Sequence, residues 1–193
     1  MKNIVAIYGS PRRQGNTAIL LDHAVCGAEK AGAQVEKIVL RDLTISPCLE
    51  IYGCKETGLC VIKDDFQRVQ EQLLACQALM FASPVFFYTV SAHSKILMDR
   101  CQSLWVKKYW IDKVPFGKGE LQKKGIFISV GATKGERLFD GILLTAKYFF
   151  DVIDVKLWKT LLFRDIDFEK DILKHPEYLQ AAYEAGKELA LLS

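Results

Sequence analysis

The sequence predicts an α/β fold in which a doubly wound parallel sheet of five strands lies between two layers of helices. Short apolar runs rich in β-branched residues alternate along the chain with longer segments whose apolar residues recur at helical spacing. The strand runs contain few polar residues, as is typical of strands that are buried on both faces. Because the chain has 193 residues, half of them apolar and a quarter charged, we expect one domain over residues 1–193.

The expected elements follow one another as strand and helix. The strands are expected at residues 4–8, 35–40, 78–82, 125–130 and 152–162, the last as one strand or a strand pair. The helices are expected at residues 18–32, 66–76, 91–103, 136–150 and 177–192. Residues 43–65, with a proline, two glycines and three cysteines, are interpreted as an excursion from the core, as are residues 104–124. The loops after the first, third and fourth strands should then meet at one edge of the sheet.

The first of these loops, residues 9–17, has the composition of an anion site. A strand that turns through glycine and hydroxyl residues into a helix leaves backbone N–H groups unpaired at the positive end of the helix dipole. The residues that could contribute to such a site are Ser10, Arg12 or Arg13, Gly15, Asn16 and Thr17. We interpret the loop as a phosphate cradle, with an ordinary capped turn between strand and helix as the alternative.

The glycine spacing in this loop restricts the kind of phosphate. Gly9 and Gly15 are too far apart for the dinucleotide pattern G-x-G-x-x-G, and no Gly-Lys-Ser/Thr follows as in a triphosphate loop. The loop therefore suits one terminal phosphomonoester better than a pyrophosphate or a metal-bound triphosphate.

The loop sequence G-S-P-R-x-x-G-N-T resembles that of the flavodoxin-like NAD(P)H-dependent FMN reductases, in particular the branch that contains iron–sulfur flavoproteins. Residues 83–91, Ser-Pro-Val-Phe-Phe-Tyr-Thr-Val-Ser, resemble that family's S-P-V-Y-x-x-x-V-S loop, which packs on the flavin ring. Residues 131–136 correspond in position to its third flavin loop. The resemblance implies a flavodoxin-like fold and bound FMN, held by Ser10, Arg12, Gly15, Asn16, Thr17, Pro84, Val85, Phe86, Phe87, Tyr88, Ser91, Gly131 and Ala132. The alternatives are that the aromatic residues belong to the core and that the third loop is a plain turn.

The same resemblance implies an oxidoreductase that passes electrons from NAD(P)H through bound FMN to a small acceptor such as a flavin or a quinone. No side chain is expected to act as a catalyst. Since one flavodoxin-like domain uses nearly the whole chain, the pyridine nucleotide should stack transiently on the flavin and leave before the acceptor binds. The family forms dimers and tetramers, so a homodimer or homotetramer is expected. The alternatives are an FMN-containing electron carrier and an iron–sulfur flavoprotein without direct NAD(P)H oxidation.

The six cysteines are expected to be reduced thiols, because no secretory signal is recognisable. Cys26 and Cys76 lie in apolar helical contexts and are expected in the core. Iron–sulfur flavoproteins of this branch carry C-x2-C-x2-C and a fourth cysteine shortly after. Cys48, Cys54 and Cys60 occupy the first, third and fourth of these positions, and Ile51 occupies the second. Because a cubane cluster takes four thiolates, we expect no stable cluster and no metal here, only a remnant of the motif, and a zinc site lacks an evident fourth ligand.

The net charge and the hydropathy of the chain limit the kinds of partner that we expect. The net charge of +3 and the absence of a basic run give no argument for nucleic acid, and no apolar run is long enough to span a membrane, so a cytoplasmic protein is expected. Residues 104–124 carry six lysines against two acidic residues, interleaved with aromatic residues. This segment is either an arm that packs on a second subunit and attracts an anionic substrate, or a surface excursion whose aromatic residues pack locally.

Overall fold

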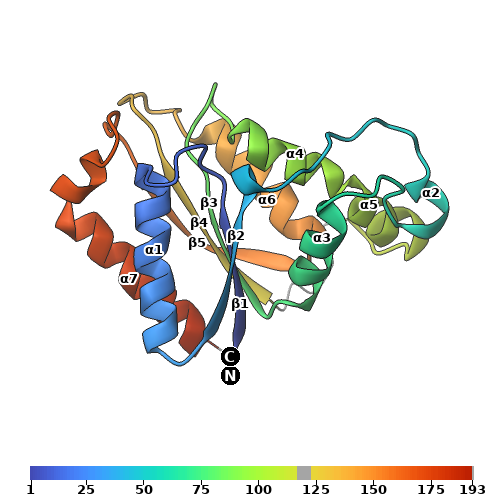
Figure 1. Cartoon of the computed structure of the whole chain (residues 1–193), viewed down its shortest axis with the longest axis horizontal. Coiled ribbons are helices and arrows are strands. Elements are labelled where there is room, and N and C mark those ends of the chain that lie inside the picture. Colours follow the sequence, from blue (N-terminus) through green and yellow to red (C-terminus); the bar gives the residue numbers. More distant parts are fainter. Residues whose placement is uncertain (117–122, 193) are drawn as a thin grey trace.

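Five parallel strands form one sheet in the order β2-β1-β3-β4-β5 in the computed structural model, which describes residues 1–116 and 123–192 (Figure 1). The strands are β1 (Asn3–Tyr8), β2 (Gln34–Val39), β3 (Ala78–Ala82), β4 (Lys123–Val130) and β5 (Val155–Phe163). The predicted doubly wound fold is confirmed, and the fifth strand is single rather than a pair. None of the described helices is both long and apolar enough to cross a bilayer.

Helices cover both faces of the sheet (Figure 1). Successive residues of a strand point to opposite faces, and in β1 Ile4 and Ala6 join the core under one helical layer while Val5 and Ile7 join the core under the other. The first layer consists of α1 (Asn16–Lys30) and α7 (Pro176–Leu191), and the second of α3 (Phe66–Ala75), α4 (Ala92–Arg100) and α6 (Asp140–Val152). The five described strands and these helices thus make the three layers that the sequence predicts.

Shorter elements lie within or directly before the two excursions and before the last helix. They are η1 (Leu40–Asp42), α2 (Cys54–Thr57), α5 (Gln102–Trp105), η2 (Val106–Ile111) and η3 (Asp171–Lys174). Within residues 104–116, the aromatic residues pack on one another: Trp105 contacts Tyr109 and Trp110 with ring centroids 5.4 Å apart, and Tyr109 contacts Phe116 at 5.2 Å. This local packing agrees with the surface-excursion alternative. Lys118 and Glu120 of the predicted arm lie outside the described residues.

Three sequence predictions need correction. The helix expected from residue 136 begins at Asp140, because residues 135–140 form turns in which Leu138 N–H donates to Gly135 and Asp140 N–H donates to Arg137. The first helix begins two residues earlier than expected, at Asn16. Cys76 is buried as predicted, but Cys26 is exposed on the outer side of α1, so its predicted place in the core was wrong. Apolar neighbours in a helix do not fix which side of it a small residue takes.

Candidate functional site

The candidate site lies where the chain changes direction within the sheet. From β1 the chain runs outward to β2 and then returns to β3 on the other side of β1, and such a switch point leaves a crevice at the carboxyl ends of the strands. An open cavity of about 200 Å³ occupies this place. It is lined by residues 10–12, 15–17, 84–86 and 130–132, which follow β1, β3 and β4, and by residues 166 and 167, which follow β5. The three loops predicted from the sequence therefore meet.

The N-terminus of α1 presents unpaired donors to this cavity. Gly15, the N-cap residue, has an extended backbone and no side chain caps the helix, whose first turn holds no acidic residue. The backbone N–H groups of residues 16–18 donate to no partner within the described residues. Ser10 and Thr17 are buried beside them, and Ser10 Oγ accepts a hydrogen bond of 3.0 Å from Arg12 N–H. An anion bound here would receive donors that the protein itself leaves unsatisfied.

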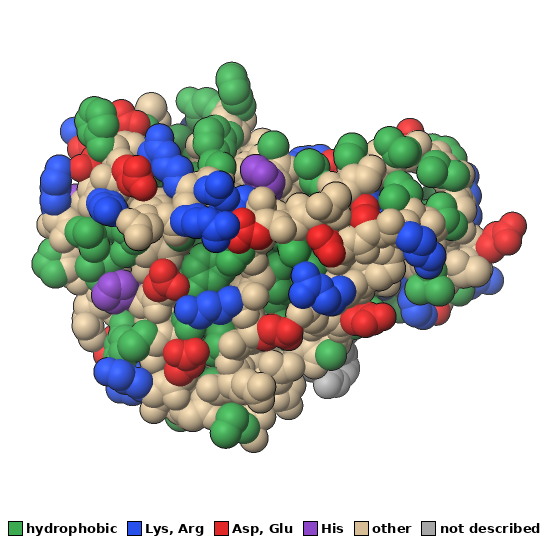
Figure 2. All heavy atoms as spheres, in the orientation of Figure 1, with side chains coloured by type: hydrophobic (Ala, Val, Ile, Leu, Met, Phe, Trp, Pro, Cys, Tyr) green, Lys and Arg blue, Asp and Glu red, His purple; other side chains and the backbone are tan. Residues whose placement is uncertain are grey.

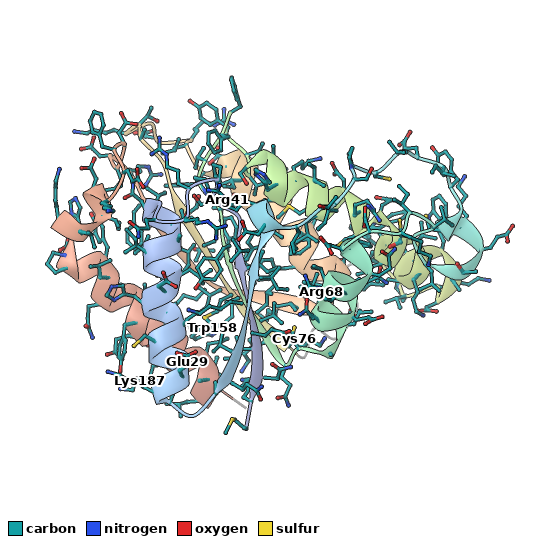
Figure 3. All side chains as sticks on the ribbon, in the orientation of Figure 1. Glu29, Arg41, Arg68, Cys76, Trp158 and Lys187 are labelled. Carbon is teal, nitrogen blue, oxygen red and sulfur yellow. The ribbon has the colours of Figure 1, made fainter. Side chains whose placement is uncertain are left out.

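The loop before α1 is held closely by its neighbours. A Cβ atom placed on Gly15 would lie 2.7 Å from Ser10 Oγ, so any side chain at this position would intrude on the cradle. Arg13 makes two hydrogen bonds, of 2.9 and 2.7 Å, to the Asp42 carboxylate, and Arg41 donates to the Pro11 carbonyl oxygen. Of the two arginines that the sequence offered, Arg12 is therefore the one that lines the cavity. Arg41 stands at the end of β2 in Figure 3, and Figure 2 shows basic side chains gathered in that region.

The side chain of Asn16 hydrogen-bonds to other residues of the protein. Its Nδ2 donates to the Phe168 carbonyl oxygen at 2.8 Å and its Oδ1 accepts from Ile172 N–H at 3.2 Å. These bonds draw the segment after β5 over the cradle, where Ile166 and Asp167 line the cavity. Sequence reasoning missed both of these residues. No motif marks them, and they are placed there by long-range contacts, those of Asn16 and a hydrogen bond of 3.3 Å from Ile166 N–H to the Gly131 carbonyl oxygen.

Ser91 lies outside the cavity and hydrogen-bonds to two of the loops that form it. It caps α4, where its Oγ accepts from Ser94 N–H at 3.3 Å, and the same hydroxyl donates to the Gly9 carbonyl oxygen. Its N–H donates to Ser83 Oγ at 3.0 Å, and all three serines are fully buried. Ser91 does not line the cavity, and its hydrogen bonds join the loop after β3 to the end of β1.

The aromatic loop after β3 is a tight hairpin turn. Phe86 and Thr89 exchange two backbone hydrogen bonds of 2.9 and 3.0 Å, and the two residues between them have positive φ, 48° at Phe87 and 61° at Tyr88. Phe86 lines the cavity with Pro84 and Val85, whereas Phe87 and Tyr88 stand beside it and Phe87 is 99% exposed. Left-handed backbone at two consecutive aromatic residues is strained, and such strain commonly marks a functional position.

We predict that replacing Phe87-Tyr88 with Asn-Gly stabilises the fold. Asn-Gly is the preferred pair for a two-residue turn with positive φ at both positions. The double variant F87N/Y88G should therefore gain about 1 kcal/mol in the free energy of unfolding, measured by urea titration. If the two rings contact bound FMN as the sequence predicts, the same variant should also bind FMN more weakly.

The single variant F87A separates the two effects, because it removes a ring without supplying the residues that the turn prefers. A loss of stability in F87N/Y88G would contradict the assignment of strain to this turn. An unchanged FMN affinity in both variants would remove Phe87 from the flavin site.

The cavity residues fit FMN in two respects. The cradle at α1 offers backbone N–H groups, hydroxyls and Arg12 to a phosphate, in a space that the Cβ of any residue other than glycine at position 15 would partly fill. Next to it, Pro84, Val85 and Phe86 provide apolar walls of the kind that a flat aromatic ring requires. The N–H groups of Val85 and Gly131 donate to the carbonyl oxygens of Val130 and Phe163, whereas the N–H group of Ala132, which also lines the cavity, has no described partner.

A larger cavity, of about 570 Å³, lies away from this edge, against the cysteine segment and helices α4 and η2. It shares no lining residue with the smaller cavity. The smaller cavity is the better candidate for the cofactor site, because it adjoins the N-terminus of α1, a helix of 15 residues with unpaired donors, whereas the helices that begin at the larger cavity, α2 and α5, have four residues each. Size is a weaker criterion than the chemistry of the lining.

Known proteins resemble this chain in sequence and in fold. The family model described as NADPH-dependent FMN reductase matches residues 2–138. An iron–sulfur flavoprotein of Archaeoglobus fulgidus is 34% identical over 154 residues, 79% of this chain and 74% of that protein. An iron–sulfur flavoprotein of Methanocaldococcus jannaschii is 38% identical over 101 residues. The match covers about half of each protein, 52% of this chain and 52% of that one. The solved structure of an NAD(P)H:quinone oxidoreductase from Methanothermobacter marburgensis superposes with a TM-score of 0.70 at 17% identity, over 100% of this chain and 98% of that one, which shows a shared fold.

Proposed function

Because the chain belongs to the NADPH-dependent FMN reductase family, in the branch of the iron–sulfur flavoproteins, we propose that it binds FMN at this cavity and passes electrons from NAD(P)H to a small acceptor. The acceptor would be a flavin, a quinone or a similar molecule. The observation that carries the proposal is the set of unpaired backbone donors at residues 16–18, placed directly beside the apolar walls at residues 84–86.

The chain's own residues would bind and orient the cofactor. The N–H groups of residues 16–18 and the hydroxyls of Ser10 and Thr17 would donate to the phosphate, and Arg12 would balance its charge. Pro84, Val85 and Phe86 would exclude water from one side of the ring. When bound, FMN supplies the redox chemistry, accepting a hydride from a pyridine nucleotide and passing electrons to an acceptor. The protein thus acts by position and electrostatics, and no side chain needs to serve as acid, base or nucleophile.

The proposal includes a second copy of the chain and a cytoplasmic location. An almost fully exposed Phe87 on a strained turn beside the cavity supports contact with a homodimer or homotetramer partner. The six free thiols suit a reducing compartment.

The test is anaerobic stopped-flow mixing of the FMN-loaded protein with NADPH and, separately, with NADH. Flavin absorbance at about 450 nm reports the oxidised cofactor. We expect it to bleach within one turnover for at least one of the two nucleotides. If FMN binds but neither nucleotide bleaches it, the protein is an electron carrier rather than a reductase. If FMN does not bind, the cradle at residues 10–17 has been misassigned.

A further inference from the structure

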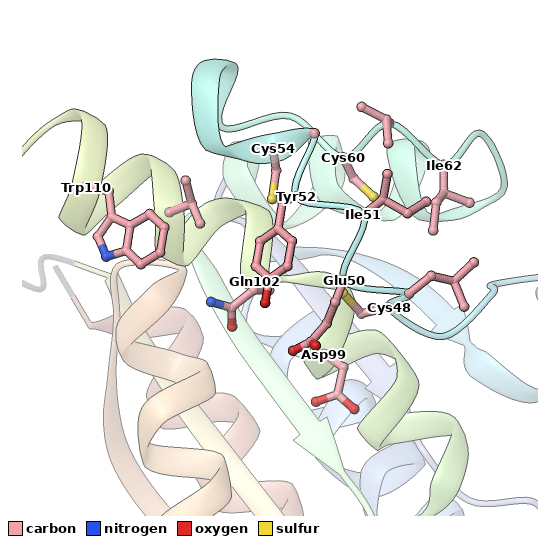
Figure 4. A pocket seen from close by; sticks show the side chains of 14 residues that line it. Cys48, Glu50, Ile51, Tyr52, Cys54, Cys60, Ile62, Asp99, Gln102 and Trp110 are labelled. Atoms are coloured by element: carbon pink, nitrogen blue, oxygen red, sulfur yellow. The ribbon is translucent and has the colours of Figure 1, made fainter.

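The second cavity is surrounded by thiols. Its volume is about 570 Å³, and Cys48, Cys54 and Cys60 all line it, together with apolar side chains of the same segment. Figure 4 shows the three sulfur atoms around the stretch of chain that carries Ile51 and Tyr52. All three cysteines are half-buried and none is in a disulfide.

The residues here do not fit a four-iron cluster. Such a cluster takes four thiolate ligands, and the motif's second position is Ile51, whose side chain is 59% exposed. Within the described residues, no group of three or more His, Cys, Asp or Glu side chains is arranged to hold a metal ion. A four-iron cluster therefore does not explain the presence of these three thiols at one cavity.

Cys54 and Cys60 occupy the two ends of one short loop. Gly53 and Val61, which flank them, are in close contact, because a Cβ on Gly53 would lie 2.5 Å from Val61 Cγ1. Between them the chain forms α2 and reverses at Gly58, whose φ is 71° and whose N–H donates to the Cys54 carbonyl oxygen at 2.8 Å. The loop thus brings the two cysteines to adjacent stems. Cys48 lies earlier in the segment, outside this loop.

A buried arginine lies beside one of the two. Arg100, whose side chain is fully buried, forms an ion pair with Asp64 and donates to the carbonyl oxygens of Ser46 and Ile62, yet its Nε has no hydrogen-bond partner among the residues that the structure describes. Burial by itself lowers the pKa of Arg100, but the hydrogen bond with Asp64 and the neighbouring Cys60 sulfur outweigh burial and raise it. The guanidinium therefore stays charged. A charged guanidinium with an unpaired donor, next to Cys60, can donate to an oxygen added to that sulfur.

Two other cysteines, Cys76 and Cys101, are fully buried, and at Cys101 burial outweighs the neighbouring charge of Arg100. Burial raises the pKa of the Cys76 thiol, and it raises that of Cys101 to about 12. Such thiols are poor nucleophiles. Cys26 is exposed on α1, in the helical layer on the opposite face of the sheet, and serves as an internal reference.

We propose that Cys54 and Cys60 form a reversible dithiol–disulfide pair that a hydroperoxide oxidises and a small thiol reduces. The Cys60 sulfur attacks the peroxide, the O–O bond breaks, and the leaving oxygen takes the thiol proton, which leaves S–OH on Cys60. The Cys54 sulfur then attacks the Cys60 sulfur, an S–S bond forms, and the hydroxyl leaves with the Cys54 proton as water. The two thiols lose two electrons, and the hydroperoxide is reduced to water or an alcohol. Two equivalents of a small thiol reverse the change. The pair functions whether or not FMN is bound.

The experiment uses the full-length protein, treated with one equivalent of hydrogen peroxide, alkylated and mapped by peptide mass spectrometry. We expect a Cys54–Cys60 link within one chain that dithiothreitol removes, and the control variant C26S should form it equally. In C54S, dimedone should trap a sulfenic acid on Cys60. In C60S, Cys54 should be labelled no faster than Cys26. A link between other cysteines, or a Cys60 oxidised no faster than Cys26, would overturn the proposal.

Arg100→Lys tests the role of the guanidinium. It keeps the positive charge but loses the Nε donor, and oxidation of Cys60 should slow about tenfold. The matched control is Arg68→Lys at an exposed arginine on α3, which should leave the rate unchanged. An unchanged rate in folded Arg100→Lys would show that the guanidinium does not assist Cys60. If that variant fails to fold, the comparison of Cys60 with Cys26 in the unaltered protein decides.

Discussion

Replacing Gly15 with alanine is expected to weaken FMN binding about 10- to 100-fold while leaving riboflavin binding unchanged. The added Cβ would lie 2.7 Å from Ser10 Oγ and 3.2 Å from Arg12 Cβ, so the cradle must open and some of its donors must leave the phosphate. Hydrogen bonds to a charged group contribute about 1.5–3 kcal/mol each, which corresponds to the expected change in affinity. The measurement is a fluorescence titration of the apoprotein with FMN and with riboflavin, which lacks the phosphate.

Gly135→Ala is the matched control, because a Cβ at Gly135 meets no atom of the described residues within 4 Å and its φ is not in the left-handed region. It should bind both flavins as the unaltered protein does. An equal loss for FMN and riboflavin in Gly15→Ala would mean that the change disturbs the ring site or the fold. No loss for either would place the phosphate elsewhere.

Replacing Asp64 with asparagine is expected to lower the free energy of unfolding by about 3–5 kcal/mol, because the buried Arg100 charge loses its counter-ion. For a chain of this length that corresponds to a fall in Tm of about 6–20 °C. The Asp64 side chain is only 10% exposed, and it also accepts from the N–H groups of Ser46 and Phe66 at 2.9 and 3.0 Å. It therefore holds the cysteine segment, α3 and α4 together. The measurement is urea unfolding at pH 7, with Asp112→Asn as the control. The Lys107–Asp112 pair is about half exposed, so that loss should be within about 1 kcal/mol.

The effect of Asp64→Asn should shrink in acid. Burial alone raises the pKa of Asp64, but the hydrogen bonds from Arg100, Ser46 and Phe66 outweigh burial and hold the folded-state pKa below its ordinary value. A lowered folded-state pKa gives stability that is fully present above the unfolded-state pKa of about 3.9 and is lost as the pH falls through the folded-state value. The two proteins should therefore converge in stability in the acid range below the unfolded-state pKa of about 3.9. A difference that stays constant from pH 7 into that range would contradict an ionised Asp64.

The sequence by itself determined the architecture and which loops meet at the candidate site. Strand runs such as residues 78–82 were predicted to the residue, because a buried parallel strand needs a continuous apolar stretch that few other structures tolerate. The cradle at residues 10–17 could be predicted because the local order of strand, glycine turn and helix creates its unpaired donors without help from distant residues. Helix ends were less certain: the turns at residues 135–140 replace the first turn of a predicted helix.

Only the tertiary structure decided which side chains at the candidate site can contact a ligand. It also decided which residues surround the cysteines of residues 48–60. The Asn16 side chain, predicted to bind the ligand, hydrogen-bonds instead to the backbone of residues 168 and 172. Ser91 lies outside the cavity and hydrogen-bonds to the end of β1. Ile166 and Asp167 reach the cavity through these contacts over about 150 positions of sequence. The neighbourhood of Cys60 and the buried Arg100 likewise depends on the packing of α4 against a distant loop. Local pattern determines which backbone groups are left unpaired, but whether a side chain points at a ligand or at another residue depends on what the fold places next to it.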